Sequence, residues 1–206
     1  MNSSLTKSEI NRIRDNNLQY LLNSKKLHLI LDFDHTLVHS RKLHKLASTE
    51  KTTIDSNKNT KSIEDNVYKT CGGDYMVKLR PGVREFIKLG GLCKGEAKGV
   101  DNVVLSHERV VVIVDDTVTI WEECCKRNLL QIGGYKYFPI KKGFIDQEKD
   151  TELVRVVRVL MLVHTLFYDD SFVINNAWPR EYGSRDVRDA LEAVLITSRS
   201  GFGLRG

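Results

Sequence analysis

Several kinds of sequence feature are missing from this chain, and each absence excludes a class of protein. The four cysteines form neither a zinc-binding Cys-x-x-Cys pair nor a small disulfide scaffold. The first ten residues are polar and lack the apolar core of a secretory signal. The Gly-x-x-x-x-Gly-Lys-[Ser/Thr] pattern of nucleotide-binding P-loops does not occur. These absences favour an intracellular protein whose thiols are free.

Long apolar runs and internal repeats are also missing. The most apolar stretch, Leu153 to Phe167, is interrupted by Arg155, Arg158 and His164. A membrane-spanning helix needs about 20 predominantly apolar residues in succession. We therefore expect a soluble protein with no membrane partner, located in the cytoplasm or the nucleus.

The composition is that of one main domain with a moderate positive charge. The 206 residues, 41% of them hydrophobic, suffice to bury one substantial core. The net charge is +5, yet 27 acidic residues accompany the 32 basic ones and no long basic block occurs. This balance indicates an affinity for anionic partners, including phosphopeptides, and it does not indicate direct nucleic-acid recognition.

The apolar pattern predicts an α/β fold with helices at both ends. Thr6 and Glu9 have the spacing of a helix capping box, which predicts a helix over about residues 6–23. Leu27–Leu31 and Val110–Val114 are short apolar runs typical of strands buried on both faces of a parallel sheet. The expected organisation is an N-terminal helix at 1–23, a core at 24–145 with a flexible insertion at 47–66, a helical extension at 146–199 and a disordered tail at 200–206.

Shorter elements are predicted between and after the two apolar strands. Pro81 is expected in the first turn of a helix that Gly90-Gly91 ends. Ser184 is a plausible cap for a helix with apolar positions from Val187 to Leu195. Three further short strands are predicted at Tyr75–Leu79, Asn128–Ile132 and Tyr135–Phe138.

Two aspartates directly follow the first predicted strand. Residues two apart in an extended segment point the same way, so Asp32 and Asp34 should project together from its carboxyl end. Ligands bind at this end in open α/β sheets. Two carboxylates about 4 Å apart repel by roughly 4 kcal/mol at an effective dielectric of 20, which calls for a compensating cation. His35 alternates with the aspartates and is expected to point away from the site.

A second acidic pair, Asp115 and Asp116, follows the second predicted strand. Three or four hard oxygen donors at the end of a sheet suit Mg²⁺. Any single aspartate could instead cap a loop or a helix. Two apolar strands that each end in an acidic pair favour a metal site formed by Asp32, Asp34, Asp115 and Asp116.

Such a site predicts phosphoryl chemistry. Asp32, nearest the strand, is the expected nucleophile that forms an aspartyl-phosphate, and Asp34 the general acid and base. Thr36 would orient Asp34 or the phosphate, although a threonine after a turn is as often a plain cap. A receiver-type phosphoacceptor could also use a strand-end aspartate, but the second aspartate two residues on favours hydrolysis.

Five segments together resemble one known family. LILDFDHTLVHS at Leu29–Ser40 is similar to the signature of the haloacid dehalogenase superfamily in the form used by RNA polymerase II C-terminal-domain phosphatases. The stretch Leu153–Leu195 resembles the helical extension of the plant members. The other similar segments are KLRPGVREF at 78–86, ERVVVIVDDTVTIW at 108–121 and NLLQIGGYKYF at 128–138.

The resemblance implies a fold, an activity and a partner. The fold would be a Rossmann-like parallel sheet of the haloacid dehalogenase type. The activity would be that of a nuclear, Mg²⁺-dependent protein serine/threonine phosphatase. Its partner and substrate would be the phosphorylated C-terminal repeats of the largest subunit of RNA polymerase II. Lys98 corresponds to the family's phosphate-binding lysine, with a solvated loop lysine as the alternative.

The sequence departs from this family in one internal segment. Between the KLRPGVREF-like helix and the lysine, relatives carry a strand and loop with a Thr-Met-Gly element that holds the phosphate. The 25 residues from Glu85 to Arg109 lack it, and a complete βαβ unit needs roughly 30 residues or more. The chain also stops before the interaction module of many relatives. An incomplete sheet is expected, and the alternatives are an impaired pseudophosphatase that binds phosphopeptides or transcription partners, or a mis-spliced product that folds poorly.

Overall fold

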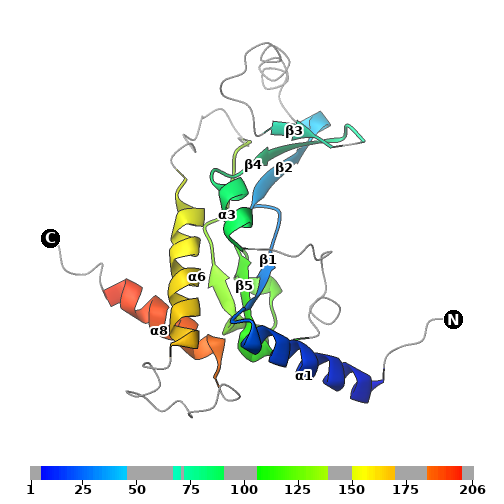
Figure 1. Ribbon diagram of the computed structural model, residues 1–206. Helices are drawn as coiled ribbons and strands as arrows, with labels where there is room; N and C mark the ends of the chain where they lie inside the picture. Colours follow the sequence, from blue (N-terminus) through cyan, green and yellow to red (C-terminus); the bar gives the residue numbers. More distant parts are fainter. Residues whose placement is uncertain are drawn as a thin grey trace.

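The computed structural model describes residues 6–45, 67–70, 72–90, 106–138, 150–169 and 185–200. Its strands form two small sheets, with helices packed around them (Figure 1). A parallel sheet in the order β1-β5-β6 lies at the centre, and an antiparallel sheet in the order β2-β4-β3 lies beyond its carboxyl edge. The predicted α/β fold with a Rossmann-like parallel sheet is therefore confirmed.

The central strand of the parallel sheet is β5 (Val111–Asp115), and each of its residues is buried. It pairs in parallel with β1 (His28–Leu31) on one side and with β6 (Leu129–Gln131) on the other. The prediction of a strand buried on both faces is confirmed for β5 and wrong for β1, whose residues are only half-buried. In the described part of the chain no strand pairs with the outer edge of β1, which explains its exposure.

The N-terminal helix α1 (Lys7–Asn23) forms as its capping box predicts. The Glu9 N–H donates to Thr6 Oγ1 at 3.3 Å, and the Thr6 N–H donates to Glu9 Oε2 at 2.9 Å. Leu18 and Leu22 join the main hydrophobic core. The helix thus contributes its apolar side to the same core as the parallel sheet.

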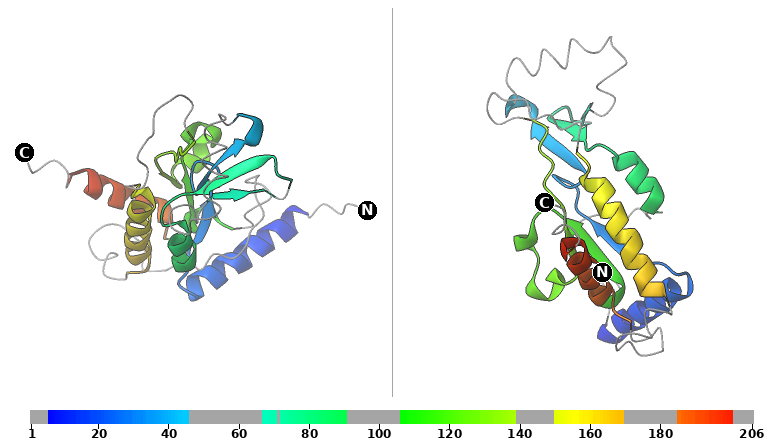
Figure 2. Two further views of the ribbon diagram at one scale, coloured as in Figure 1. Left: turned by 90° about the horizontal axis from the view of Figure 1, so that it is seen from above. Right: turned by 90° about the vertical axis from the view of Figure 1, so that its left-hand side faces the viewer.

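The C-terminal helices α6 (Glu152–Tyr168) and α8 (Val187–Ser200) cross each other on one side of the parallel sheet (Figure 2). The side of α6 that faces the core carries buried residues at helical spacing: Leu153, Val156, Val159, Val163 and Phe167. The first turn of α8 is capped by Asp186, whose Oδ1 accepts the Arg188 N–H at 2.9 Å. Ser184, the cap expected from the sequence, lies outside the described residues.

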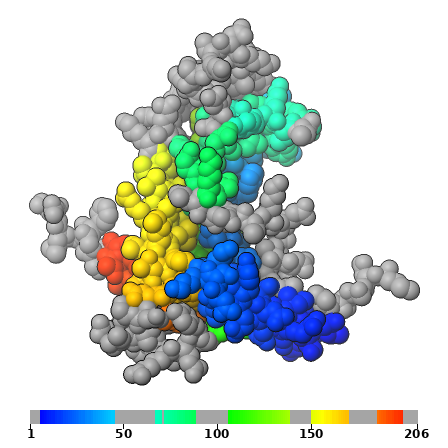
Figure 3. All heavy atoms as spheres, viewed as in Figure 1, coloured from blue at the N-terminus to red at the C-terminus, as the bar shows by residue number. Residues whose placement is uncertain are grey.

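The antiparallel sheet consists of β2 (Val38–Lys42), β3 (Val67–Lys69) and β4 (Tyr75–Leu79), and the strand predicted at Tyr75–Leu79 is confirmed. Helix α3 (Val83–Gly90) follows β4 and lies side by side with α6 in the space-filling view (Figure 3). It begins two residues later than Pro81 predicts. The reason is Gly82, whose φ of 80° is left-handed and cannot continue a right-handed turn.

Short helical turns complete the described structure. They are η1 (Leu43–Lys45), η3 (Glu108–Val110), η4 (Val118–Ile120) and α5 (Glu123–Lys126). None of the helices in the described ranges combines the length and apolar character that crossing a membrane requires. The division into domains drawn from the sequence stays a prediction.

One predicted strand is wrong, and several predictions lie outside the described residues. Residues Tyr135–Phe138 form no strand. Tyr135 and Phe138 are buried, and the N–H groups of Tyr137 and Phe138 donate to Nδ1 of His39, a side chain, rather than to another strand. The insertion at 47–66, the connector after Gly90 and the end of the chain after Ser200 lie outside the described residues.

Candidate active site

Three carboxylates meet at the carboxyl ends of β1 and β5. Asp32 directly follows β1, Asp115 is the last residue of β5, and Asp116 comes next. Each offers one carboxylate oxygen, and these oxygens lie within 4.8 Å of one another. The three carboxylates lie close together because β1 and β5 pair in parallel and end at the same edge of the sheet. The pairing extends one residue beyond β1, where the Asp32 N–H donates to the Val114 carbonyl at 2.9 Å.

The Asp115 carboxylate is held in one orientation by two donors. Its Oδ1 accepts the Thr117 N–H at 2.7 Å, and its Oδ2 accepts the indole Nε1–H of Trp121 at 3.0 Å. The residue is 1% exposed. A buried carboxylate with two donors keeps its position, so Asp115 is a fixed point around which the other two carboxylates are arranged.

The pKa of Asp32 reflects its burial first and the neighbouring negative charges second. Burial raises the pKa of Asp32, and the charges of Asp115 and Asp116 raise it further. The Phe33 N–H and, least of all, the Thr36 hydroxyl lower the pKa in part. A divalent cation with oxygen ligands would compensate three converging carboxylates, so this donor set fits Mg²⁺.

Thr36 lies within the loop after β1 and is fully buried. Its Oγ1 is close enough to Asp32 to affect that pKa, but no atom of the described residues meets the geometry of a hydrogen bond to it. A buried hydroxyl without a partner costs about 1–3 kcal/mol. Its position beside the carboxylates leaves this hydroxyl free to donate to a bound ligand.

Asp34, expected beside Asp32, is not a member of the carboxylate cluster. The chain leaves the strand at Leu31 and turns, so alternation along an extended segment no longer applies. Asp34 Oδ1 instead accepts the Ser40 N–H at 3.0 Å and the Ser40 hydroxyl at 2.9 Å. His35 has a left-handed φ of 64°, and its Nε2 lies 3.7 Å from Asp34 Oδ2.

Lys98, the expected phosphate-binding lysine, lies outside the described residues. The strand ends therefore bring together Asp32, Asp115 and Asp116, with Thr36 beside them and Asp34 apart. The catalytic and ligand roles of all of these residues stay predictions.

A buried arginine that sequence reasoning missed ties the site together. The guanidinium of Arg80 is 1% exposed. It donates to the Thr36 carbonyl at 3.0 Å, to the Gly133 carbonyl at 2.7 Å and to Asp150 Oδ2 at 2.9 Å, and it stacks 5.5 Å from the ring centroid of Tyr135. Nothing local marks it, because arginines are mostly exposed.

His39 on β2 anchors the segment that follows β6. Its Nδ1 accepts the N–H groups of Tyr137 at 2.8 Å and Phe138 at 2.9 Å. Burial, followed by the charge of His35, lowers the pKa of His39 to about 4. The ring is therefore neutral near pH 7, and its proton resides on Nε2.

Comparison with known proteins connects this geometry to a family. Residues 27–91 match the family model described as NLI interacting factor-like phosphatase. Over 249 aligned positions the chain is 28% identical to RNA polymerase II C-terminal domain phosphatase-like 4 of Arabidopsis thaliana. The chain is thus similar to C-terminal-domain phosphatases, and the segment matched by the family model is residues 27–91.

The match to the Arabidopsis protein covers 92% of the present chain and 54% of that protein, so the chain spans about half the length of this relative. Two solved structures are also similar. One is described as that of Fcp1, an essential RNA polymerase II CTD phosphatase, with a TM-score of 0.45, 18% identity and coverage of 95% of this chain and 72% of that one. The other is a fission yeast Fcp1 variant bound to beryllium fluoride, with a TM-score of 0.44, 17% identity and the same coverage.

The family match and the structure together show which parts of the chain supply the acidic residues of the site. The matched segment contains Asp32, Asp34, Thr36 and Arg80 but ends before Asp115 and Asp116. The second acidic pair joins the first segment only through the β1–β5 pairing. The carboxylate cluster is thus a product of the fold rather than of one continuous motif.

Proposed function

We propose that the chain is a Mg²⁺-dependent protein serine/threonine phosphatase of the nucleus that acts on the phosphorylated C-terminal repeats of the largest subunit of RNA polymerase II. The observation that carries this proposal is the convergence of Asp32, Asp115 and Asp116 within 4.8 Å at the ends of two parallel strands. The proposed substrate follows the name of the Arabidopsis relative, and the proposed location follows the substrate.

The residues of the site have distinct roles in this proposal. Asp32, Asp115 and Asp116 would hold Mg²⁺, which when bound neutralises charge on the phosphoryl group. An ionised oxygen of Asp32 attacks phosphorus, and the serine oxygen leaves as the phosphoaspartate forms. Asp32 is half-buried, so this oxygen is accessible to a peptide.

Proton transfer is assigned to Asp34. In its protonated form it donates to the leaving serine oxygen, and as a carboxylate it then accepts the proton of the water that hydrolyses the phosphoaspartate. Its side chain is 47% exposed, which leaves Oδ2 open to a substrate while Ser40 holds Oδ1. Thr36 and Lys98 are proposed as donors to the phosphate.

The experiment that tests this function measures the release of an aryl alcohol from an aryl phosphate in the presence of Mg²⁺. We expect turnover by the unaltered chain and none above background by Asp32→Asn. The matched control is Asp74→Asn, which removes an exposed carboxylate on the turn before β4. Equal rates of turnover by the unaltered chain and by Asp32→Asn would show that Asp32 is not the nucleophile.

A second candidate function is phosphopeptide binding without hydrolysis. The segment from Glu85 to Arg109 favours this second candidate, because it contains no Thr-Met-Gly element. Removing one donor aimed at a developing charge lowers the rate by about 10²–10³. This candidate predicts measurable binding of Mg²⁺ and phosphopeptides with no turnover, and appreciable hydrolysis that depends on Asp32 would rule it out.

A further inference from the structure

One face of the small antiparallel sheet carries a row of basic side chains. Met76 at the centre of β4 pairs with Arg41 of β2 on one side and with Lys69 of β3 on the other. Paired residues lie on the same face of a sheet, as do residues two apart along a strand. Lys78 therefore shares this face with Arg41 and Lys69.

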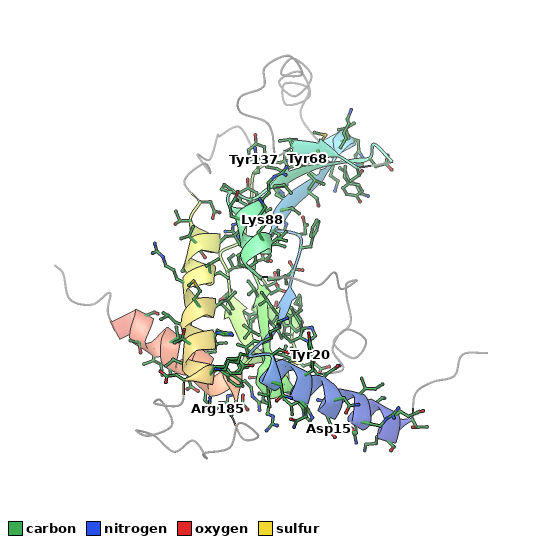
Figure 4. The ribbon with its side chains drawn as sticks, in the orientation of Figure 1. Asp15, Tyr20, Tyr68, Lys88, Tyr137 and Arg185 are labelled. Atoms are coloured by element: carbon green, nitrogen blue, oxygen red, sulfur yellow. The ribbon has the colours of Figure 1, made fainter. Side chains whose placement is uncertain are left out.

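A fourth basic residue is contributed by the segment that covers this face. Phe138 packs on Met76, and the N–H groups of Phe138 and of Tyr137 before it donate to His39 of β2. Lys78 Nζ lies 4.8 Å from the centroid of the Tyr137 ring, which Figure 4 places over the small sheet. Lys136 immediately precedes Tyr137 and is exposed. We call Arg41, Lys69, Lys78 and Lys136 the basic rim.

The local charge around the basic rim is strongly unbalanced. Residues 38–45, 67–70, 72–80 and 135–138 contain seven Lys or Arg residues and a single acidic residue, Asp74. Of the seven, Arg80 is neutralised by Asp150. Arg41 and Lys136 both help to lower the pKa of His39, after burial and His35. Of the seven, Arg41, Lys69, Lys78 and Lys136 belong to the basic rim, and their positive charges attract anions.

The basic rim adjoins the loop that carries the proposed nucleophile. The ring centroids of His35 and His39 are 4.9 Å apart, and His39 faces Lys78 in the strand register. Ser40, next to Arg41 on β2, donates two hydrogen bonds to Asp34. A peptide whose phosphoserine reaches Asp32 would therefore pass close to the basic rim.

We propose that the basic rim binds further acidic groups of the substrate, so that the chain selects peptides that carry more than one phosphate. The inference rests on the proposed function and specifies the substrate class of the same site. Lys and Arg form charge-assisted hydrogen bonds with phosphate oxygens. A second phosphate next to the hydrolysed one would be attracted to these cations, and a singly phosphorylated peptide carries no such second group.

A phosphopeptide fits this face better than RNA does. Proteins that bind single-stranded RNA offer exposed aromatic rings on which bases stack. Among the described residues, the exposed tyrosine on the side of the basic rim is Tyr137, and the Lys78 ammonium lies 4.8 Å from its ring centroid. Tyr68 and Tyr75 are also exposed, but the strand register places them on the opposite face of the sheet. Cations without an open stacking platform suit phosphates rather than bases.

The test measures binding to the full chain carrying Asp32→Asn, so that no turnover is needed. Fluorescence anisotropy compares two peptides of one sequence, with one and with two phosphoserines. We expect the doubly phosphorylated peptide to bind about tenfold more tightly, the gain typical of one additional charged hydrogen bond. Lys69→Glu combined with Lys136→Glu should reduce this preference to less than about twofold.

The matched control combines Lys7→Glu with Lys88→Glu, two exposed lysines on α1 and α3 that change the net charge equally. It should keep the full preference. If the charge-reversed rim variant does not fold, as judged by circular dichroism, Lys69→Gln combined with Lys136→Gln replaces it and should lower the preference as well.

Three results would overturn the inference. They are an equal affinity for the two peptides, an equal preference in the rim and control variants, and stronger binding of a single-stranded RNA of the same charge than of the doubly phosphorylated peptide. The proposed function fails separately, when the unaltered chain hydrolyses no phosphate although the rim-dependent binding preference is present.

Discussion

A Cβ atom added at Gly134 would lie 2.9 Å from Oδ2 of Asp116. The backbone at Gly134 therefore passes against one of the three carboxylates of the site, and only glycine leaves room for that carboxylate. Atoms this close must move apart, and the end of a side chain moves more readily than backbone does. The close approach at Gly134 therefore constrains where the Asp116 carboxylate lies and does not constrain the fold.

Gly134→Ala should displace the Asp116 carboxylate and weaken Mg²⁺ binding by about 10-fold, the lower end of the range for changes next to metal ligands. The free energy of unfolding without metal should change by less than about 1 kcal/mol, because only a carboxylate end has to rotate. The measurement is a calorimetric Mg²⁺ titration. Gly133→Ala is the control, since its Cβ would meet Glu152 at 3.4 Å. Equal Mg²⁺ affinities for the two variants would contradict the prediction.

Asp32→Asn should stabilise the metal-free protein at pH 7. The pKa of Asp32 is raised in the folded state, so the folded protein binds more protons than the unfolded chain just above the usual pKa of an aspartate. Ionised Asp32 therefore destabilises the fold at pH values above its raised pKa, and this destabilisation disappears as the pH falls below the unfolded pKa.

Thermal unfolding with a chelator measures this effect. Because Asp32 is partly exposed, the gain should not exceed about 1 kcal/mol, or about 2–4 °C in Tm. Added Mg²⁺ should raise the Tm of the unaltered chain more than that of Asp32→Asn. Asp74→Asn, which changes an exposed carboxylate, serves as the control. A lower Tm for metal-free Asp32→Asn at pH 7 would show that burial and carboxylate repulsion do not make ionised Asp32 destabilising.

Arg80→Met should destabilise the protein by about 3–5 kcal/mol, because it leaves the buried end of the Asp150 carboxylate and two carbonyl groups without a donor. Arg80→Lys should recover only part of this loss, since an ammonium cannot reproduce the planar fork. Urea denaturation measures both. Arg84→Met, which alters an exposed arginine on α3, should change stability by about 0.5 kcal/mol or less. A loss for Arg80→Met no larger than that for Arg84→Met would contradict the role of Arg80.

Stability should fall as the pH is lowered from about 6.5 towards 4, and His39 should account for part of the fall. Its pKa is about 4 when folded, below the ordinary 6.5 of histidine. The unfolded chain therefore binds the proton first as the pH decreases, and the folded state loses stability over this range, by on the order of 2 kcal/mol after allowance for screening.

His39→Asn tests this pH dependence. The Asn side-chain oxygen can take the place of Nδ1 as the acceptor for Tyr137 and Phe138, but the side chain does not titrate. The slope of unfolding free energy against pH between 4 and 6.5 should be shallower in His39→Asn than in His44→Asn, which changes an exposed histidine. Identical slopes would show that His39 does not control this pH range.

The parts of the site that could be predicted from the sequence are those set by local pattern. Asp32 and the Asp115-Asp116 pair each follow an apolar run, and parallel pairing then places such residues at one edge. Asp34 was expected at the same edge because extended backbone alternates. The turn that removes it is closed by hydrogen bonds from the N–H groups of Leu37 and Val38 to the Phe33 carbonyl, and those bonds leave no distinct pattern in the sequence.

Features that depend on distant partners could not be predicted. The sequences of β1 and β5 are similarly apolar, and only their neighbours make one strand half-buried and the other buried. Tyr135 to Phe138 alternate like a strand but bind the side chain of His39, which is 98 residues away from Tyr137 in the sequence. The burial of Arg80 depends on Asp150 in the same way.

The separation of 70 positions between Arg80 and Asp150 in the sequence also sets an order of events during synthesis. On the ribosome, β1, β2 and β4 emerge well before the carboxylate that neutralises Arg80. Burying that guanidinium without its counter-charge would be strongly unfavourable, so the nascent chain has to keep it hydrated until α6 begins to emerge. Closure of the loop that carries Asp32 is therefore a late step in the biogenesis of the protein.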